Sequence, residues 1–318
     1  MRRHAFVLLV VLATTARAGA QTAVPTYYTP DPKFSESLKS IVSQARLDSS
    51  FDVGEDGKET ISLAVIDLTG KKPVFGGVHY DNFIYPASVY KMYVAMEILR
   101  QASEGRFSLF DSRVVQSPND VDRSKEITFD PRPLLRNADT VSIHYLLDLM
   151  ITRSDNSAAN CLIDIAGRPN INKTMLENDW AGSEVTRKFL KRAVEDPGYD
   201  TIRSTETCAL HAADFMYRIY TEKLVNPWVS MRMQSYLAMQ LDTTKLSPGL
   251  PGNVMFSHKT GWWSYYTHDV GIVEDGTISY IIALFTPVPE ERARPRMAEV
   301  ARRVHELIVR RHPRSSKN

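Results

Sequence analysis

Along this chain, apolar residues recur in some stretches at the spacing of a helix and in others as the short apolar runs of strands. These stretches predict its secondary-structure elements. A helix is predicted after Asp31, which suits an N-cap, with Pro32 in the first turn and apolar residues following at helical spacing. A second amphipathic helix is predicted over residues 290–311, and helical periodicity dominates residues 87–245. The predicted strands share short apolar runs bounded by turn residues, and they cover residues 61–67, 73–80, 254–259, 269–273 and 277–285.

This order of elements predicts the fold class. Strands at both ends of the chain with helices between them indicate an α/β (α+β) fold, in which both chain ends build one antiparallel sheet with flanking helices. We expect an α/β lobe of about residues 31–80 and 246–312, and an inserted all-α lobe of about residues 81–245. Both lobes belong to a single predicted domain, residues 21–318, and a cleft between lobes is a usual place for an active site.

The first twenty residues have the pattern of a secretory signal peptide. Two arginines precede an apolar run at residues 5–13, and small residues follow up to Ala20. Cleavage is predicted after Ala20 or after Ala18. The apolar run is shorter than the roughly 20 residues that span a bilayer, so we expect no membrane span after cleavage. The sequence therefore predicts a periplasmic or secreted protein.

Composition excludes several functions and says little about the chemistry. The 318 residues carry 39 Lys and Arg against 37 Asp and Glu, with 43% apolar and 24% charged residues. The predicted leader holds three arginines and no acid, so its removal turns the formal charge of +2 into −1. That balance argues against a nucleic-acid partner, and we expect a monomer.

Eight scattered histidines predict no metal site and no cofactor. The two cysteines, Cys161 and Cys208, either pair or stay as separate thiols.

The first motif with chemical potential is Ser88-Val-Tyr-Lys91, at the start of a predicted helix. Residues three apart on a helix share a face. A serine hydroxyl is a weak nucleophile unless a nearby base removes its proton, and a lysine whose pKa is lowered can be that base. Free backbone N–H groups at a helix start can also stabilise an oxyanion. Alone, the spacing is more typical of a capping serine and a solvated lysine.

Two further motifs follow in the chain. Ser154-Asp155-Asn156 comes after a helical stretch, and it suits either helix capping or a serine that relays a proton beside an amide that binds substrate. Lys259-Thr260-Gly261 ends a predicted strand, where lysine and threonine can bind a substrate carboxylate and glycine allows backbone to approach closely. Each motif by itself is also explained by ordinary structure.

Together and in this order, the three motifs resemble those of the penicillin-recognising serine hydrolases, most closely the class A β-lactamases. The resemblance covers roughly residues 35–312 and includes a segment at residues 183–187 that is similar to the entry of the family's Ω-shaped loop.

The resemblance implies a role for each matching residue. Ser88 would be the acylated nucleophile, Lys91 a proton acceptor, and Ser154 a proton donor to the leaving nitrogen. The backbone N–H groups of Ser88 and Trp262 would form the oxyanion hole. The residues that bind substrate would be Asn156, Lys259, Thr260, Gly261 and Trp262. Asn160 matches a position that steadies the loop, while Trp262 and Trp263 are bulkier than usual there.

One departure concerns the family's loop glutamate, which activates the water that hydrolyses the acyl-enzyme. No E-x-x-L-N pattern occurs in residues 180–207, and the expected position falls near residues 190–192. Glu195 is the nearest carboxylate and is only a weak candidate for this role.

Three functions remain open at this point. The first is an exported serine β-lactamase that hydrolyses β-lactams and confers antibiotic resistance. The second is a D-alanyl-D-alanine peptidase that acts on a peptidoglycan peptide, with which His258 is compatible. The third is a penicillin-binding protein that is acylated and turns over slowly, which the absent loop glutamate favours.

Overall fold

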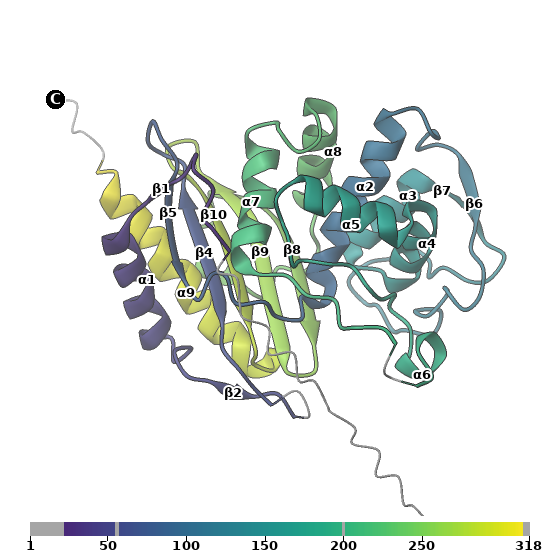
Figure 1. Ribbon diagram of the computed structural model, residues 1–318, viewed down its shortest axis with the longest axis horizontal. Helices are drawn as coiled ribbons and strands as arrows, with labels where there is room; N and C mark the ends of the chain where they lie inside the picture. The colour runs from purple at the N-terminus through teal and green to yellow at the C-terminus, as the bar shows by residue number, and fades with distance from the viewer. Residues whose placement is uncertain (1–21, 55–56, 199–200, 314–318) are drawn as a thin grey trace, which may run out of the picture.

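The computed structural model describes residues 22–54, 57–198 and 201–313 (Figure 1). The predicted signal peptide lies outside these described residues. Within them, no helix combines the length and apolar character that crossing a bilayer requires.

A six-stranded sheet forms the centre of one lobe, in the order β1-β5-β4-β10-β9-β8. Its strands are β1 (Thr29–Pro30), β4 (Ser62–Asp67), β5 (Val74–Val78), β8 (Met255–Trp263), β9 (Tyr266–Glu274) and β10 (Ser279–Thr286). Neighbouring strands are antiparallel except for the two-residue β1, which pairs with β5 in parallel. Strands from the two ends of the chain meet at β4 and β10, as the order of elements predicted. β8 forms one edge of the sheet.

Helices cover both faces of this sheet. α1 (Pro32–Gln44) and α9 (Glu290–Arg311) lie together on one face, and α7 (Ala209–Tyr220) packs on the other (Figure 1). The side chains of β4 show why. Leu63 and Val65 belong to an apolar core that includes residues of α1 and α9, whereas Ala64 and Ile66 belong to a separate core that includes residues of α7. Successive side chains of a strand point to opposite faces, so a continuous apolar run is buried on both sides.

The second lobe is mainly helical and lies beside β8 (Figure 1). Its elements are the 3-10 turn η2 (Ala87–Tyr90), α2 (Lys91–Ser103), α3 (Ile143–Asp148), the π-helical turn η3 (Leu149–Arg153), α4 (Asn156–Ala166), α5 (Arg168–Glu177), α6 (Arg192–Glu195) and α8 (Pro227–Leu237). α2 is buried over most of its length and packs against α4, α5 and α8.

The predicted fold class is confirmed, with corrections in detail. The lobe expected to be all-α also holds two paired strands, β6 (Ser112–Val114) and β7 (Thr140–Ser142), and the other lobe adds β2 (Phe51–Asp52) with β3 (Lys58–Glu59). Strands of two or three residues are too short to show an alternating pattern, so sequence periodicity does not detect them.

Candidate active site

The three sequence motifs meet between the two lobes. Ser88 lies in η2, directly after Ala87, whose φ of 46° is unusual for a residue with a side chain. Gly261 of β8 faces this turn, because a Cβ built on it would lie 2.8 Å from the carbonyl oxygen of Pro86 and 3.0 Å from the Ser88 nitrogen. The backbone that approaches Gly261 is thus the protein's own nucleophile turn. Glycine at this position lets the sheet edge and the turn form one wall of the site.

Lys91 is the centre of the polar contacts. Its Nζ lies 3.1 Å from Ser88 Oγ, 2.7 Å from the carbonyl oxygen of Ser154, 3.1 Å from Ser154 Oγ and 2.7 Å from Asn156 Oδ1. Ser154 has a φ of 60° at the end of η3, and this left-handed conformation accompanies the contact of both its oxygens with Lys91. An ammonium has three donors, so the four acceptors more than satisfy it.

Lys259 reaches the same serine from the opposite lobe. Its Nζ donates to Ser154 Oγ at 3.0 Å and to the carbonyl oxygen of Thr260 at 2.8 Å. A continuous chain of contacts therefore runs from Ser88 Oγ through Lys91 Nζ and Ser154 Oγ to Lys259 Nζ. Such a chain can move a proton from the serine to a group bound beside Ser154.

Burial determines the protonation of both lysines. Lys91 is fully buried, and desolvation, followed by the positive charge of Lys259, lowers its pKa well below the ordinary value. Lys259 is also fully buried, and desolvation lowers its pKa to about 7. Near neutral pH, therefore, Lys91 is suited to accept a proton, while Lys259 still carries a substantial positive charge.

Phe189 occupies the other side of Lys91. Its ring centroid lies 4.2 Å from Lys91 Nζ, and its ring stacks on that of Tyr90 at 4.7 Å. Asn160 binds both backbone groups of Phe189: Oδ1 accepts from the N–H at 2.7 Å, and Nδ2 donates to the carbonyl at 3.4 Å. The Tyr90 hydroxyl donates to the carbonyl of Arg187 at 3.1 Å and so binds the same loop. Thus the residue that the loop presents to Lys91 is aromatic and carries no carboxylate.

Sequence reasoning missed Phe189 by a short distance. The position expected for a loop carboxylate fell near residues 190–192, one residue beyond it. The signal that identifies Phe189 is its pairing with Asn160, and these residues come together only in the folded chain.

Glu195 points into the loop. Its Oε1 accepts from the backbone N–H of Lys188 at 2.8 Å and from Arg168 at 3.1 Å, and its Oε2 lies 3.4 Å from Arg187. The side chain is only 7% exposed. These contacts give the carboxylate a structural explanation, because it closes the turn of the chain between residues 188 and 195.

The aromatic residues after the third motif lie at the edge of the site. Thr260 is buried, whereas Trp262 and Trp263 are 52% and 63% exposed. Trp262 pairs with Thr267 of β9, next to the hairpin turn, and its backbone directly follows Gly261. Two large apolar side chains are thus presented to solvent beside the nucleophile turn.

Other residues that the sequence singled out have structural surroundings. His258 is buried with its Nδ1 2.8 Å from Asp269 Oδ1, and it stacks on Phe256. Cys161 and Cys208 are separate free thiols, so they do not pair here, and burial raises their pKa values to about 11 and about 12. Among the described residues, no group of three or more His, Cys, Asp or Glu side chains is arranged to hold a metal ion.

Comparisons with known proteins give a matching family model. The model of the "Beta-lactamase enzyme family" matches residues 44–308. No curated protein sequence matches the chain.

Several solved structures share the fold. PBP-A is 19% identical with a TM-score of 0.73, and the match covers 91% of this chain and all of PBP-A. A β-lactamase from Sphaerobacter thermophilus is 17% identical with a TM-score of 0.71, covering 86% of this chain and 97% of its own. A leucine-to-glutamate variant of PBP-A, solved as an acyl-enzyme with penicillin G, is 19% identical with a TM-score of 0.72, covering 88% of this chain and 98% of its own.

Proposed function

The chain belongs to the β-lactamase enzyme family, and we propose that it is an exported serine enzyme that β-lactams acylate at Ser88 and that releases the acyl group slowly. It is a β-lactamase-like serine hydrolase by family and fold. The single observation that carries the finer proposal is the environment of Lys91, which has Ser88 and Ser154 on one side and the ring of Phe189 on the other.

The first half-reaction follows from the contacts of Lys91. Neutral Lys91 takes the proton of Ser88 Oγ across their 3.1 Å contact, and the oxygen attacks the lactam carbonyl carbon. Backbone N–H groups of Ser88 and Trp262 stabilise the oxyanion. When the C–N bond breaks, Ser154 gives its proton to the leaving nitrogen and regains one from Lys91. Lys259 and Thr260 bind the substrate carboxylate, and Asn156 binds its side-chain amide.

The second half-reaction lacks an evident base. Hydrolysis of the ester on Ser88 needs a group that takes a proton from water. Phe189 cannot do so. The carboxylate of Glu195 accepts from the backbone N–H of Lys188 and from Arg168, and it lies 3.4 Å from Arg187 in an ion pair. This contrast favours slow release over the rapid turnover of a resistance enzyme.

The acyl-enzyme lifetime tests the proposal. The protein is mixed with penicillin G, and the intact mass is followed by mass spectrometry, with peptide mapping of Ser88. We expect one added penicilloyl group per chain that persists for hours. Rapid hydrolysis of a chromogenic cephalosporin without accumulation of the adduct would overturn slow release and support a β-lactamase. Release of D-alanine from a peptidoglycan peptide would identify a D-alanyl-D-alanine peptidase.

Export is tested separately by expression with and without residues 1–20. We expect the full-length chain to appear outside the cytoplasm with its leader removed after Ala18 or Ala20, as N-terminal sequencing would show. Retention of an uncut chain would contradict this part of the proposal.

A further inference from the structure

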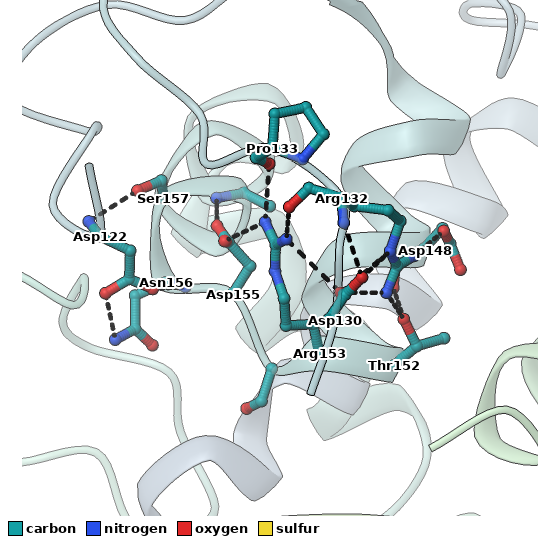
Figure 2. A network of polar contacts seen from close by, with 12 residues as sticks. Asp122, Asp130, Arg132, Pro133, Asp148, Thr152, Arg153, Asp155, Asn156 and Ser157 are labelled. Atoms are coloured by element: carbon teal, nitrogen blue, oxygen red, sulfur yellow. Dashed lines mark hydrogen bonds and ion pairs between the residues drawn. The ribbon is translucent and has the colours of Figure 1, made fainter. Parts of the chain in front are cut away.

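The segment that joins β6 to β7 packs against the Ser154-Asp155-Asn156 turn, and it contains a carboxylate that the reaction above does not use (Figure 2). We infer that Asp122 is a positioning residue that holds the Asn156 amide with its oxygen toward Lys91. This inference rests on the proposed acylation of Ser88.

The contacts of Asn156 define its orientation from both sides. Its backbone N–H donates to Asp122 Oδ2 at 2.8 Å, and its Nδ2 donates to Asp122 Oδ1 at 3.3 Å. On the other side, its Oδ1 accepts from Lys91 Nζ at 2.7 Å. A carboxylate only accepts, so a flipped amide would turn its oxygen toward Asp122 and lose the Nδ2 contact, whatever the protonation state of Lys91. Asp122 therefore selects the orientation in which Asn156 supports the base.

Asp122 is itself held in place by the start of α4. The side chain of Asp122 is nearly buried, and its backbone N–H donates to Ser157 Oγ at 2.9 Å. Its carboxylate binds Asn156, the first residue of this eleven-residue helix, where a negative charge also interacts favourably with the helix dipole. Contacts with two successive residues of α4 leave Asp122 little freedom to rotate.

The same segment also binds Arg153, which precedes the Ser154-Asp155-Asn156 turn. The fully buried guanidinium of Arg153 donates to the carbonyls of Arg132 and Pro133 at 2.7 and 3.2 Å, and to Asp155 Oδ2 at 2.9 Å (Figure 2). Asp130 lies 3.4 Å from Arg153. Ser154 thus lies between Arg153 and Asn156, and this segment binds both of those residues.

Charge gives Asp122 a second effect on the base. Burial and Lys259 lower the pKa of Lys91, and Asp122 makes the largest opposing contribution, followed by Asp155. Lys125, from the same segment, also lowers the pKa of Lys91 through its positive charge. Neutralising Asp155 would also break its buried ion pair with Arg153, so Asp122 is the better carboxylate to substitute.

Three variants test the inference through the rate of acylation by a fluorescent penicillin between pH 5 and 9. Asp122→Asn keeps the size and one acceptor but removes the charge. Asp122→Ala removes both acceptors. Asp120→Asn is the matched control, since Asp120 is a buried carboxylate of the same segment that binds Ser117 and Arg123. Melting temperatures of all three proteins report their folding.

We expect the acid limb of the Asp122→Asn profile to move to lower pH, because a less stabilised ammonium of Lys91 loses its proton more readily. Asp122→Ala should slow acylation about tenfold to a hundredfold, the loss typical of removing hydrogen bonds to a charged group. Asp120→Asn should keep the original profile even if its melting temperature falls. If Asp122→Ala does not fold, the profile of Asp122→Asn decides.

Asp122 variants that keep both the rate and the acid limb of the control would overturn this inference alone. Failure of the unmodified protein to be acylated would instead overturn the proposed function and, with it, the basis of the inference.

Discussion

The two sides of Lys91 differ in how they were built. On one side, Ser88, Ser154 and Asn156 lie on helix starts and turns that buried cores support, and all three are polar. On the other side, a long loop presents the ring of Phe189, and its nearby acid, Glu195, pairs with Arg168 of α5 and with Arg187. The first side retains groups for forming an acyl-enzyme, whereas the second retains no evident group for breaking it. Under the proposed function, formation and breakdown of the acyl-enzyme would therefore depend on different sides of Lys91.

The difference has a physical origin. Residues on the polar side touch one another across both lobes, so each substitution there disturbs several contacts. Phe189 is held through its backbone, by Asn160, and through its stacking on Tyr90. The contacts with Asn160 are to the backbone and would remain if the side chain changed, whereas the stacking on Tyr90 would be lost.

Removal of the nucleophile should produce the largest effect. Ser88→Ala deletes the hydroxyl oxygen that forms the proposed ester, so no penicilloyl adduct should be detected by mass spectrometry. Ser103→Ala, at the exposed end of α2, is the control and should be acylated normally. An adduct on Ser88→Ala would place the nucleophile elsewhere and remove the comparison.

Restoring a carboxylate to the loop should have the next largest effect. Phe189→Glu places an acid beside Lys91, and a positioned general base accelerates a reaction by about 10²- to 10⁴-fold. We expect release of the acyl group to quicken within that range, followed as loss of the mass adduct. Phe189→Gln removes the same ring without supplying a base, so it is the matched control. Equal release rates in both variants would show that the ring, and not the absent carboxylate, determines the lifetime.

The rate of acylation should fall by about tenfold per pH unit beyond the pKa of a group whose proton it requires. Lys259 has a pKa of about 7, so its positive charge is present below that pH and disappears above it. Binding of a substrate carboxylate should therefore weaken as pH rises through about 7. Lys259→Arg keeps its charge at pH 9, so its acylation profile should lack this alkaline limb. An unchanged limb in that variant would assign the titration to another group.

The smallest effect on chemistry is expected from Glu195→Gln. The substitution weakens the acceptor of Lys188 and Arg168 in a nearly buried place, so we expect a loss of about 1–3 kcal/mol in the free energy of unfolding, measured in urea. The lifetime of the acyl-enzyme should not change. A longer lifetime would show that Glu195 takes part in deacylation. Both sides of Lys91 would then supply a group that the reaction uses.

Much of the fold followed from local patterns. The helices over α1 and α9 and the strands β4, β9 and β10 have enough residues for their periods to be read, and their predicted positions agree with the structure. β6 and β7 were missed because three residues do not display a period. The segment between these two strands carries Asp122, which we infer positions Asn156.

The site divides in the same way. The sequence by itself determined which residues are candidates for acyl transfer, because Ser88, Lys91, Ser154 and Lys259 stand in short motifs whose spacing depends only on local geometry. Tertiary structure alone decided what surrounds them. That Phe189 meets Lys91, and that Asp122 faces Asn156, depends on contacts between residues 98 and 34 positions apart. The orientation of a loop across a cleft is set by packing and by hydrogen bonds between distant segments, and no local pattern encodes it.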